Sequence, residues 1–211
     1  TLKILREVLT VCVVATALQA LPHNAYAFDV VYPPGAPKIA SDYDADDDIN
    51  GRRRSGSHKG IDITGRDGQP ILAAADGTVL EATVEDCWGP TIAVDHGIGL
   101  DGKKMIALYG HVGEMLVSEG AQIKRGDVIA RLGDYSYQCI YGIRHLHFQL
   151  GQKFRAKSDK GSNWGWAYFL ENEGSSRSPH RNWADGPGKV TCFDPKRAYP
   201  PGSLTYPVPC S

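Results

Sequence analysis

The sequence is short of net charge, of long apolar segments and of the length needed for a second large core. Its 23 Lys and Arg residues nearly balance 24 Asp and Glu residues, so the formal net charge is -1 over 211 residues. Because charges of both signs are interspersed, no long-range field attracts nucleic acid or an anionic membrane. We expect no nucleic-acid partner, and one domain with appendages.

The one long apolar run lies near the N-terminus. Lys3 and Arg6 precede the apolar residues 8–21, and Ala25-Tyr26-Ala27 follows them. This order of charged, apolar and small residues is typical of a secretory signal peptide. The run is short for a membrane-spanning helix, although an uncleaved anchor is the alternative. We expect cleavage near Ala27, and a periplasmic or secreted mature chain with no stable membrane insertion.

Export changes the interpretation of the cysteines. Cys12 lies in the signal peptide, which leaves Cys87, Cys139, Cys192 and Cys210. An even number in an oxidising compartment predicts two disulfides. We favour Cys87 with Cys139 and Cys192 with Cys210, because the second pair closes a short local loop.

The chain changes character along its length. Residues 28–57 are rich in Pro, Gly and Asp without a regular period, which predicts an extended N-terminal arm. Short runs rich in Val and Ile follow, separated by glycines, and predict an antiparallel all-β domain over residues 58–150. The expected strands are residues 60–63, 71–74, 77–80, 91–94, 105–108, 128–132 and 145–150. An insertion (151–190) and a tail (191–211) complete the chain.

Two segments of the expected domain look alike. Residues 68–79 and 120–130 both consist of glycine, an apolar strand, a glycine turn and another apolar strand. Two hairpins of one sheet are the simplest interpretation. A lipoyl-like carrier barrel is the alternative, but the turn lysine that bears the lipoyl group is not evident.

The insertion at residues 151–190 is rich in aromatic side chains. These are Trp164, Trp166, Tyr168, Phe169 and Trp183, set among Ser, Gly, Asn and Arg residues. They can stack on sugars and line a cleft, or pack as a flap on the sheet. Both interpretations remain open.

Three histidine motifs carry the candidate chemistry: His58-Lys59-Gly60-Ile61-Asp62, Tyr109-Gly110-His111 and His145-Leu146-His147-Phe148. A strand places His145 and His147 on the same face. Glycine between His58 and Asp62 lets the backbone fold so that both side chains converge. Imidazole and carboxylate suit zinc, and a catalytic zinc site has three protein ligands and an open position. His58, Asp62 and one residue of the His145/His147 pair supply that number.

The order of these motifs resembles the lysostaphin or LytM-type zinc metallopeptidases, which are peptidoglycan endopeptidases with the duplicated hybrid motif fold, an antiparallel β half-barrel. The resemblance covers about residues 57–150, with Cys192-Phe193-Asp194-Pro195 similar to the family's closing strand. It implies one Zn²⁺ per chain on His58, Asp62 and His147. It also implies catalytic roles for His111 and His145, without assigning base and oxyanion donor between them.

The resemblance implies a zinc metalloendopeptidase that hydrolyses peptide bonds of peptidoglycan cross-links or stem peptides. A secreted protease acting on glycine-rich proteins is one alternative. Another is a non-hydrolytic module that binds the cell wall or regulates amidases, although family regulators generally lack the metal ligands that are intact here. If His111 or His145 completed a four-ligand site, the zinc would be structural.

Four further features have simpler interpretations. We expect His96 to pack within the sheet and His180 to face solvent. Asp46-Asp47-Asp48-Ile49-Asn50-Gly51 matches the first half of a calcium loop, but the twelfth position is Ser57 rather than glutamate, which favours a solvated acidic turn. Arg52-Arg53-Arg54 contacts carboxylates of the wall or forms soluble surface.

Overall fold

A computed structural model describes residues 28–85, 88–133, 142–155 and 176–211. The expected signal peptide, the expected Cys87–Cys139 disulfide and the aromatic residues 164–169 lie outside these ranges. The described strands are β1 (Gly60–Thr64), β2 (Pro70–Leu72), β3 (Gly77–Glu85), β4 (Gly89–Ile98), β5 (Lys104–Gly110), β6 (Val112–Met115), β7 (Gln122–Ile123), β8 (Val128–Leu132) and β9 (His145–Gly151). A single 3₁₀ turn, η4 (Pro179–Arg181), is described after them.

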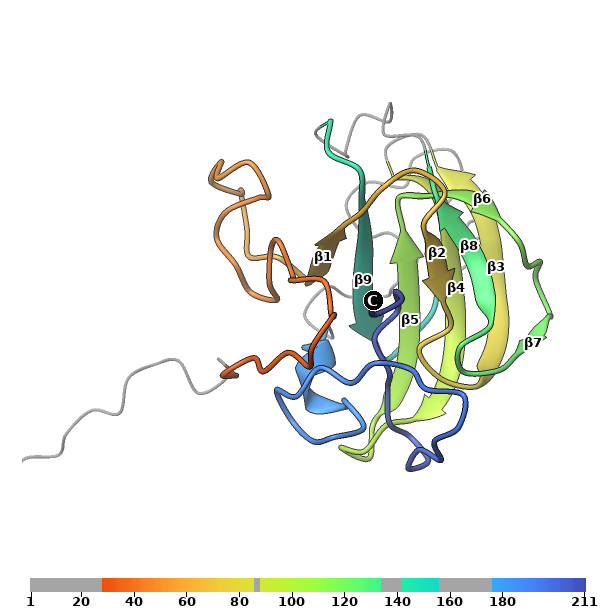
Figure 1. The fold of residues 1–211 in the computed structure, drawn as a ribbon. Helices are drawn as coiled ribbons and strands as arrows, with labels where there is room; N and C mark the ends of the chain where they lie inside the picture. The colour runs from red at the N-terminus through yellow and green to blue at the C-terminus, as the bar shows by residue number, and fades with distance from the viewer. Residues whose placement is uncertain (1–27, 86–87, 134–141, 156–175) are drawn as a thin grey trace, which may run out of the picture.

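The strands form two antiparallel sheets. The larger has the order β1-β9-β5-β4-β3-β7, and the smaller has the order β2-β8-β6. Figure 1 shows the smaller sheet lying over the β4 and β3 side of the larger one. Residues of both sheets share one buried cluster, including Ile71 and Ile129 from the smaller sheet and Val94, Tyr109 and Phe148 from the larger. The predicted all-β antiparallel fold is confirmed.

The two similar segments do not form two hairpins of one sheet, so that interpretation was wrong. Each segment places one strand in each sheet, and the two segments pair with one another. β3 pairs β7 through Gly77 and Ile123, while β2 pairs β8 through Ile71 and Ala130. Because both strands of each segment carry apolar residues, dividing them between two facing sheets lets Ile71, Val79, Ile123 and Ile129 share one core.

The seven expected strands are all present, and all except residues 128–132 have shifted ends. β3 and β4 extend well beyond their apolar centres, because long antiparallel pairing with one another continues through partly exposed residues. The short β6, in which only Val112 is fully buried, was not expected. The closing strand expected at residues 192–195 is absent from the described tail, where Pro195 lacks the N–H that a ladder requires.

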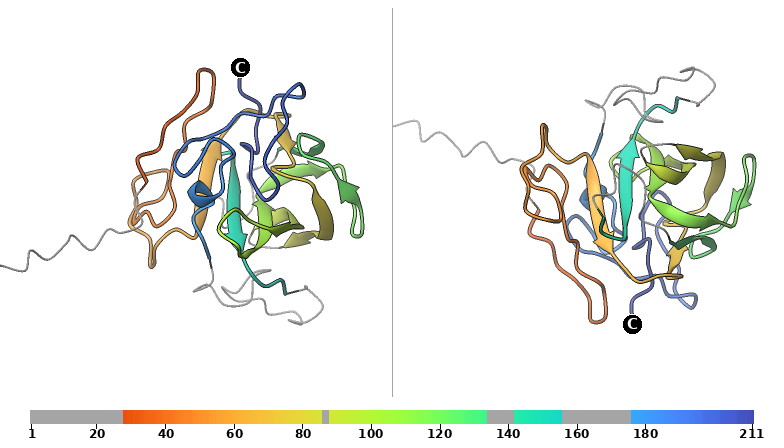
Figure 2. Two further views of the ribbon diagram at one scale, coloured as in Figure 1. Left: turned by 90° about the horizontal axis from the view of Figure 1, so that it is seen from below. Right: turned by 90° about the horizontal axis from the view of Figure 1, so that it is seen from above.

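Two terminal segments, residues 28–57 and 176–211, form an irregular layer that we call the outer layer. The arm runs beside edge strand β1, and the C-terminal segment wraps across the same end of the molecule (Figures 1 and 2). An isolated bridge joins Ser41 to Asp62 of β1, and another joins Val31 to Lys189. The arm therefore covers the edge of β1 that would otherwise be unpaired.

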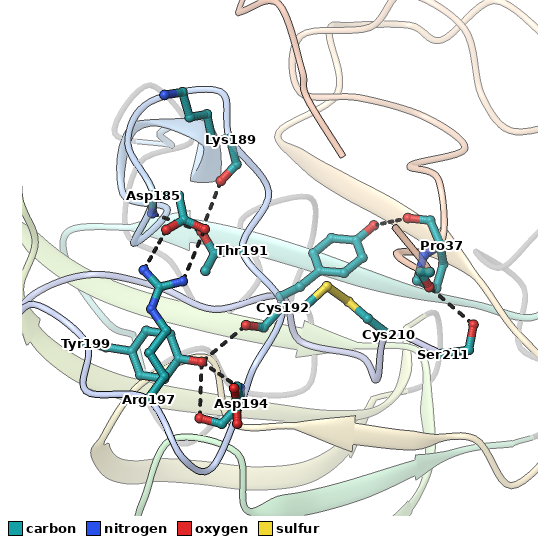
Figure 3. The surroundings of a disulfide bond; sticks show 12 residues. Pro37, Asp185, Lys189, Thr191, Cys192, Asp194, Arg197, Tyr199, Cys210 and Ser211 are labelled. Carbon is teal, nitrogen blue, oxygen red and sulfur yellow. Dashed lines mark hydrogen bonds and ion pairs between the residues drawn. A yellow bond between two sulfur atoms is a disulfide. The ribbon is translucent and has the colours of Figure 1, made fainter. Parts of the chain in front are cut away.

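A disulfide within the C-terminal segment and hydrogen bonds between the two segments hold the outer layer together. The predicted disulfide between Cys192 and Cys210 is present (Figure 3). Beside it, the Tyr206 hydroxyl donates to the Pro37 carbonyl at 3.0 Å, and Ser211 N–H donates to the Gly35 carbonyl at 3.1 Å. Among the described residues, no helix is long and apolar enough to cross a membrane.

Candidate metal centre

Three side chains meet where β1 pairs with β9. Asp62 of β1 lies opposite His147 of β9 in the ladder, and His58 precedes β1 by two residues. His147 Nδ1 lies 2.9 Å from Asp62 Oδ1 and 3.1 Å from His58 Nε2. His58 Nε2 is 3.2 Å from the same carboxylate oxygen. All three residues are buried, and they are the only group of three in the described ranges able to hold a metal ion.

Partners on the far side of each imidazole determine which nitrogen faces the cluster. His58 Nδ1 lies 2.9 Å from the Asp42 carbonyl oxygen, which only accepts hydrogen bonds, so this nitrogen carries the hydrogen. His147 Nε2 likewise donates to Gln149 Oε1 at 3.0 Å. The lone pairs of His58 Nε2 and His147 Nδ1 therefore point toward Asp62 Oδ1.

This arrangement fits a zinc ion. Three lone pairs converge on one point with no hydrogen between them, and only a positive charge, a proton or a metal ion, is favourably shared among them. Donor atoms at zinc-bond lengths in a tetrahedral site lie roughly 3.3 Å apart, which is close to the spacing observed here. Two imidazoles and one carboxylate also leave a fourth position open, as catalytic zinc sites require.

Gly60 makes room for this convergence. A Cβ at this position would lie 2.8 Å from His147 Nε2 and 2.6 Å from the Phe148 carbonyl oxygen. Glycine between His58 and Asp62 is therefore required by the neighbouring ring, as well as by the turn into β1. The sequence predicts only that Gly60 lets the backbone turn between His58 and Asp62. The close approach to His147 and Phe148 involves β9, which lies far along the chain.

His145 and His111 lie beside the three-residue cluster. His145 Nε2 is 3.7 Å from Asp62 Oδ1, while its Nδ1 donates to the Ile143 carbonyl at 2.6 Å. His111 Nδ1 donates to the Trp88 carbonyl at 2.8 Å. The His111 and His145 rings are 4.9 Å apart between centroids. Each ring thus keeps Nε2 as its acceptor.

The electrostatic environment keeps these two rings neutral near neutral pH. Burial lowers the pKa of His111 well below its usual value, and the neighbouring His145 and His147 lower it further. Burial is also the main cause that lowers the pKa of His145. His111 is one of two non-glycine residues with positive φ in the described ranges, at 62°. Such a backbone costs on the order of 1–3 kcal/mol and is often found at functional sites.

Trp88 forms one wall of the site and was not singled out from the sequence. Its ring centroid lies 4.9 Å from that of His147 and 5.2 Å from that of His111. Gly110 admits the indole, because a Cβ there would lie 3.0 Å from the Trp88 ring. A single tryptophan beside a glycine gives no sequence signal for such a role.

Comparison with known proteins agrees with this geometry. Residues 56–159 match the family model described as Peptidase family M23. The chain contains a peptidase family M23 domain. The candidate ligands His58, Asp62 and His147 all lie within it, together with His111 and His145.

Curated relatives match about half of this chain. The chain is 36% identical over 94 residues to "Lipoprotein NlpD/LppB homolog" of Pseudomonas aeruginosa, covering 44% of this chain and 29% of that protein. It is 34% identical over 104 residues to "Murein hydrolase activator NlpD" of Escherichia coli, covering 49% and 24%. An "Uncharacterized metalloprotease" of Haemophilus influenzae is 31% identical over 109 residues, covering 51% and 21%. The chain therefore spans less than a third of each of these relatives.

Solved structures of similar fold include the catalytic domain of lysostaphin from Staphylococcus simulans. That match has a TM-score of 0.45 and 22% identity, and covers 67% of this chain and 86% of that one. A zinc-containing peptidase from Vibrio cholerae has a TM-score of 0.44 and 25% identity, with coverage of 59% and 36%.

Arg54 reaches the metal centre from outside the M23 domain. Its Nη2 lies 3.0 Å from Asp62 Oδ2, the carboxylate oxygen that faces away from the histidines. The sequence predicts instead that this arginine contacts wall carboxylates or forms soluble surface. Neighbouring Arg53 does lie on the surface, paired with exposed Asp46. A run of three arginines gives no sign of which one turns inward.

Two other histidines have clear structural roles. His96 packs within the sheet, as predicted, between the Asp76 carbonyl and the Tyr109 hydroxyl, each at 2.9 Å. The expectation that His180 faces solvent was wrong. His180 is buried, accepts from Trp183 Nε1 at 2.9 Å and contacts Asp42 Oδ1 at 2.8 Å. Although the surrounding sequence is polar, His180 lies in the 3₁₀ turn η4 and packs against its neighbours.

The acidic run near residue 48 forms a turn. Asp48 Oδ1 accepts from Asn50 N–H at 2.8 Å and from Arg52 N–H at 2.9 Å. These bonds use the oxygen that a calcium loop would direct at its ion, and the solvated acidic turn remains the favoured interpretation.

Proposed function

We propose that the chain is a zinc-dependent endopeptidase that acts on peptide bonds of peptidoglycan. The observation that carries this proposal is the convergence of three lone-pair atoms beside two further buried imidazoles with available Nε2 atoms. A structural zinc site would use a fourth ligand. In His111 and His145, Nδ1 donates to a backbone carbonyl, so Nε2 is left free to accept a proton.

His58, Asp62 and His147 would hold the ion. When bound, zinc lowers the pKa of water to about 7 and polarises a carbonyl group. His145 and His111 begin neutral, since burial lowers the pKa of both. One ring takes a proton from the attacking water at Nε2 and passes it to the leaving amine. While it holds that proton at Nε2, the same ring can donate a hydrogen bond to the developing oxyanion.

Peptidoglycan is the proposed substrate because of the chain's relatives. The Escherichia coli relative is named as a murein hydrolase activator, and the Pseudomonas aeruginosa relative as a lipoprotein. The Cys192–Cys210 disulfide supports an oxidising, extracytoplasmic location for this chain. Together with the motif order, these features favour a wall peptide over a glycine-rich protein substrate.

The decisive experiment measures soluble muropeptides released from purified sacculi. We expect release by the zinc-loaded protein, little release after chelation, and a loss of about 10²–10⁴-fold in His145→Ala. Mass spectrometry of the fragments identifies the bond. His145→Ala must still bind zinc, so that lost activity is assigned to proton transfer. No release from folded, zinc-loaded protein, with a glycine-rich protein cleaved instead, would favour the secreted protease.

The second candidate is a non-hydrolytic activator of murein hydrolases. The name of the Escherichia coli relative favours it, whereas the complete donor set counts against it. A reaction containing sacculi and a murein amidase separates the two. An activator would stimulate the amidase equally as wild type and as His145→Ala, without releasing fragments when present alone.

A further inference from the structure

The arm contacts two of the three candidate ligands from outside the M23 domain. The Asp42 carbonyl accepts from His58, and Arg54 pairs with Asp62. We propose that Arg54 is a positioning residue of the metal centre, whose guanidinium holds the outer oxygen of Asp62 so that the inner oxygen faces the two imidazoles. This inference rests on the proposed metal site.

The guanidinium is itself held in place. Arg54 Nη2 donates to Asp62 Oδ2 at 3.0 Å and to Ser41 Oγ at 3.2 Å, and Arg54 Nε donates to the Asp47 carbonyl at 3.2 Å. Ser41 Oγ in turn donates to the Asp47 carbonyl at 3.1 Å. The planar fork therefore has a defined orientation at the carboxylate, which a flexible ammonium would lack.

The backbone brings the arm to this position. Ala40 N–H donates to the Asp62 carbonyl, and Asp62 N–H donates to the Ser41 carbonyl, both at 2.8 Å. His58 N–H donates to the Ala45 carbonyl at 3.0 Å. Because β1 is an edge strand, these bonds are the outer support of Asp62, which β1 carries, and of His58, which precedes it. Arg54 adds the side-chain contact that orients the carboxylate.

Two effects of Arg54 oppose each other. Its charge repels a bound cation, while its hydrogen bond restricts rotation of Asp62. The Arg54 side chain is 21% exposed and that of Asp62 is 3% exposed, so solvent reaches the guanidinium but not the carboxylate. Screening by water weakens the repulsion. The orienting contact, which lies in the buried part, therefore dominates.

Zinc affinity of the purified protein tests this inference directly. Competition with a chelator of known affinity should show that Arg54→Met binds zinc about 10–100-fold more weakly than wild type. Arg53→Met is the matched control, because Arg53 is an exposed neighbour that pairs with exposed Asp46. It should bind zinc as wild type does. The visible spectrum of the cobalt-loaded protein should change in Arg54→Met and remain unchanged in Arg53→Met.

Arg54→Lys keeps the charge and tests the fork if Arg54→Met fails to fold. It should lose zinc affinity by a smaller factor, about threefold to tenfold, because one ammonium cannot span all three acceptors. Wild-type affinity in both folded variants, or in Arg54→Lys alone if Arg54→Met is unfolded, would overturn the inference. Tighter binding by Arg54→Met would overturn it too, and would identify Arg54 as a competitor of the metal. If wild-type protein does not bind zinc, the proposed function fails as well.

Discussion

The two-sheet core and the outer layer reach the same metal centre by different physical means. In the core, β9 lies between β1 and β5, so ladder pairing on both sides positions His147, while His145 pairs with Thr64 of β1. The outer layer has no sheet of its own among the described residues. It contacts the site through individual hydrogen bonds, which include backbone bonds to Asp62 and the side-chain bonds that join His58 to the Asp42 carbonyl and Arg54 to Asp62.

This difference shows how an edge strand can carry metal ligands. A central strand has fixed neighbours, whereas β1 is paired with another strand on one side only. The arm supplies the missing side, and His180 of the C-terminal segment contacts the arm at Asp42. The M23 domain defined by sequence similarity therefore omits part of the support of its own candidate ligands.

Acidification should weaken the core more than any single change described below. Burial is the main cause that lowers the pKa of His96 to about 4, while the unfolded chain titrates near 6.5. Between these values the unfolded state binds a proton that the folded state does not, so stability falls as pH decreases from 6.5 to 4. The expected contribution is on the order of 3 kcal/mol. Urea titrations of metal-free wild type and His96→Gln should give curves that approach one another toward pH 4, whereas a constant difference would contradict the assignment.

Removal of the disulfide should affect the outer layer next most strongly. Cys192 and Cys210 are 18 residues apart, and closing a loop of this size stabilises a fold by up to about 3 kcal/mol. The double replacement Cys192→Ser/Cys210→Ser should lower the free energy of unfolding and speed limited proteolysis of the arm. If proteolysis accelerates while the denaturation midpoint is unchanged, the layer unfolds separately from the core. No change in either measurement would contradict a stabilising role.

Gln149 links the two regions and provides a sharper comparison. It accepts from His147 on β9 and donates to Ser176 Oγ of the outer layer at 2.8 Å. Gln149→Leu should weaken zinc binding about 10–100-fold, because the buried His147 Nε2 loses the acceptor that sets its orientation. Gln149→Glu keeps an acceptor and should retain affinity in the same competition titration. A comparable loss in Ser176→Ala would show that the layer also positions this core ligand.

Surface ion pairs of the outer layer should matter least. Arg197 pairs with Asp185 at 2.5 Å, but both side chains are substantially exposed. Arg197→Ala should change the free energy of unfolding by less than about 1 kcal/mol, because water and salt screen such pairs. Chemical denaturation checks this value. A larger loss would mean that surface charge, rather than buried contacts, holds the layer together.

Much of the core was predictable because its signals are local. Runs of Val and Ile between glycines predict strands, and the H-x-H spacing places two rings on one face. The crossing of residues 68–79 and 120–130 between sheets was not predictable, since hairpins and crossings have the same local pattern. The burial of His180 depends on its contact with Asp42, which is distant in the chain, whereas Pro195 is a local signal against the closing strand.

The sequence by itself determined the antiparallel β class, the family resemblance, the five candidate site residues and the Cys192–Cys210 pair, because each has a short-range pattern. Only the tertiary structure decided that Arg54 turns toward Asp62, that Asp42 and Gln149 orient the imidazoles, and that Trp88 forms a wall. These contacts join residues from separate segments, and side-chain type alone does not state which distant partner folding brings near.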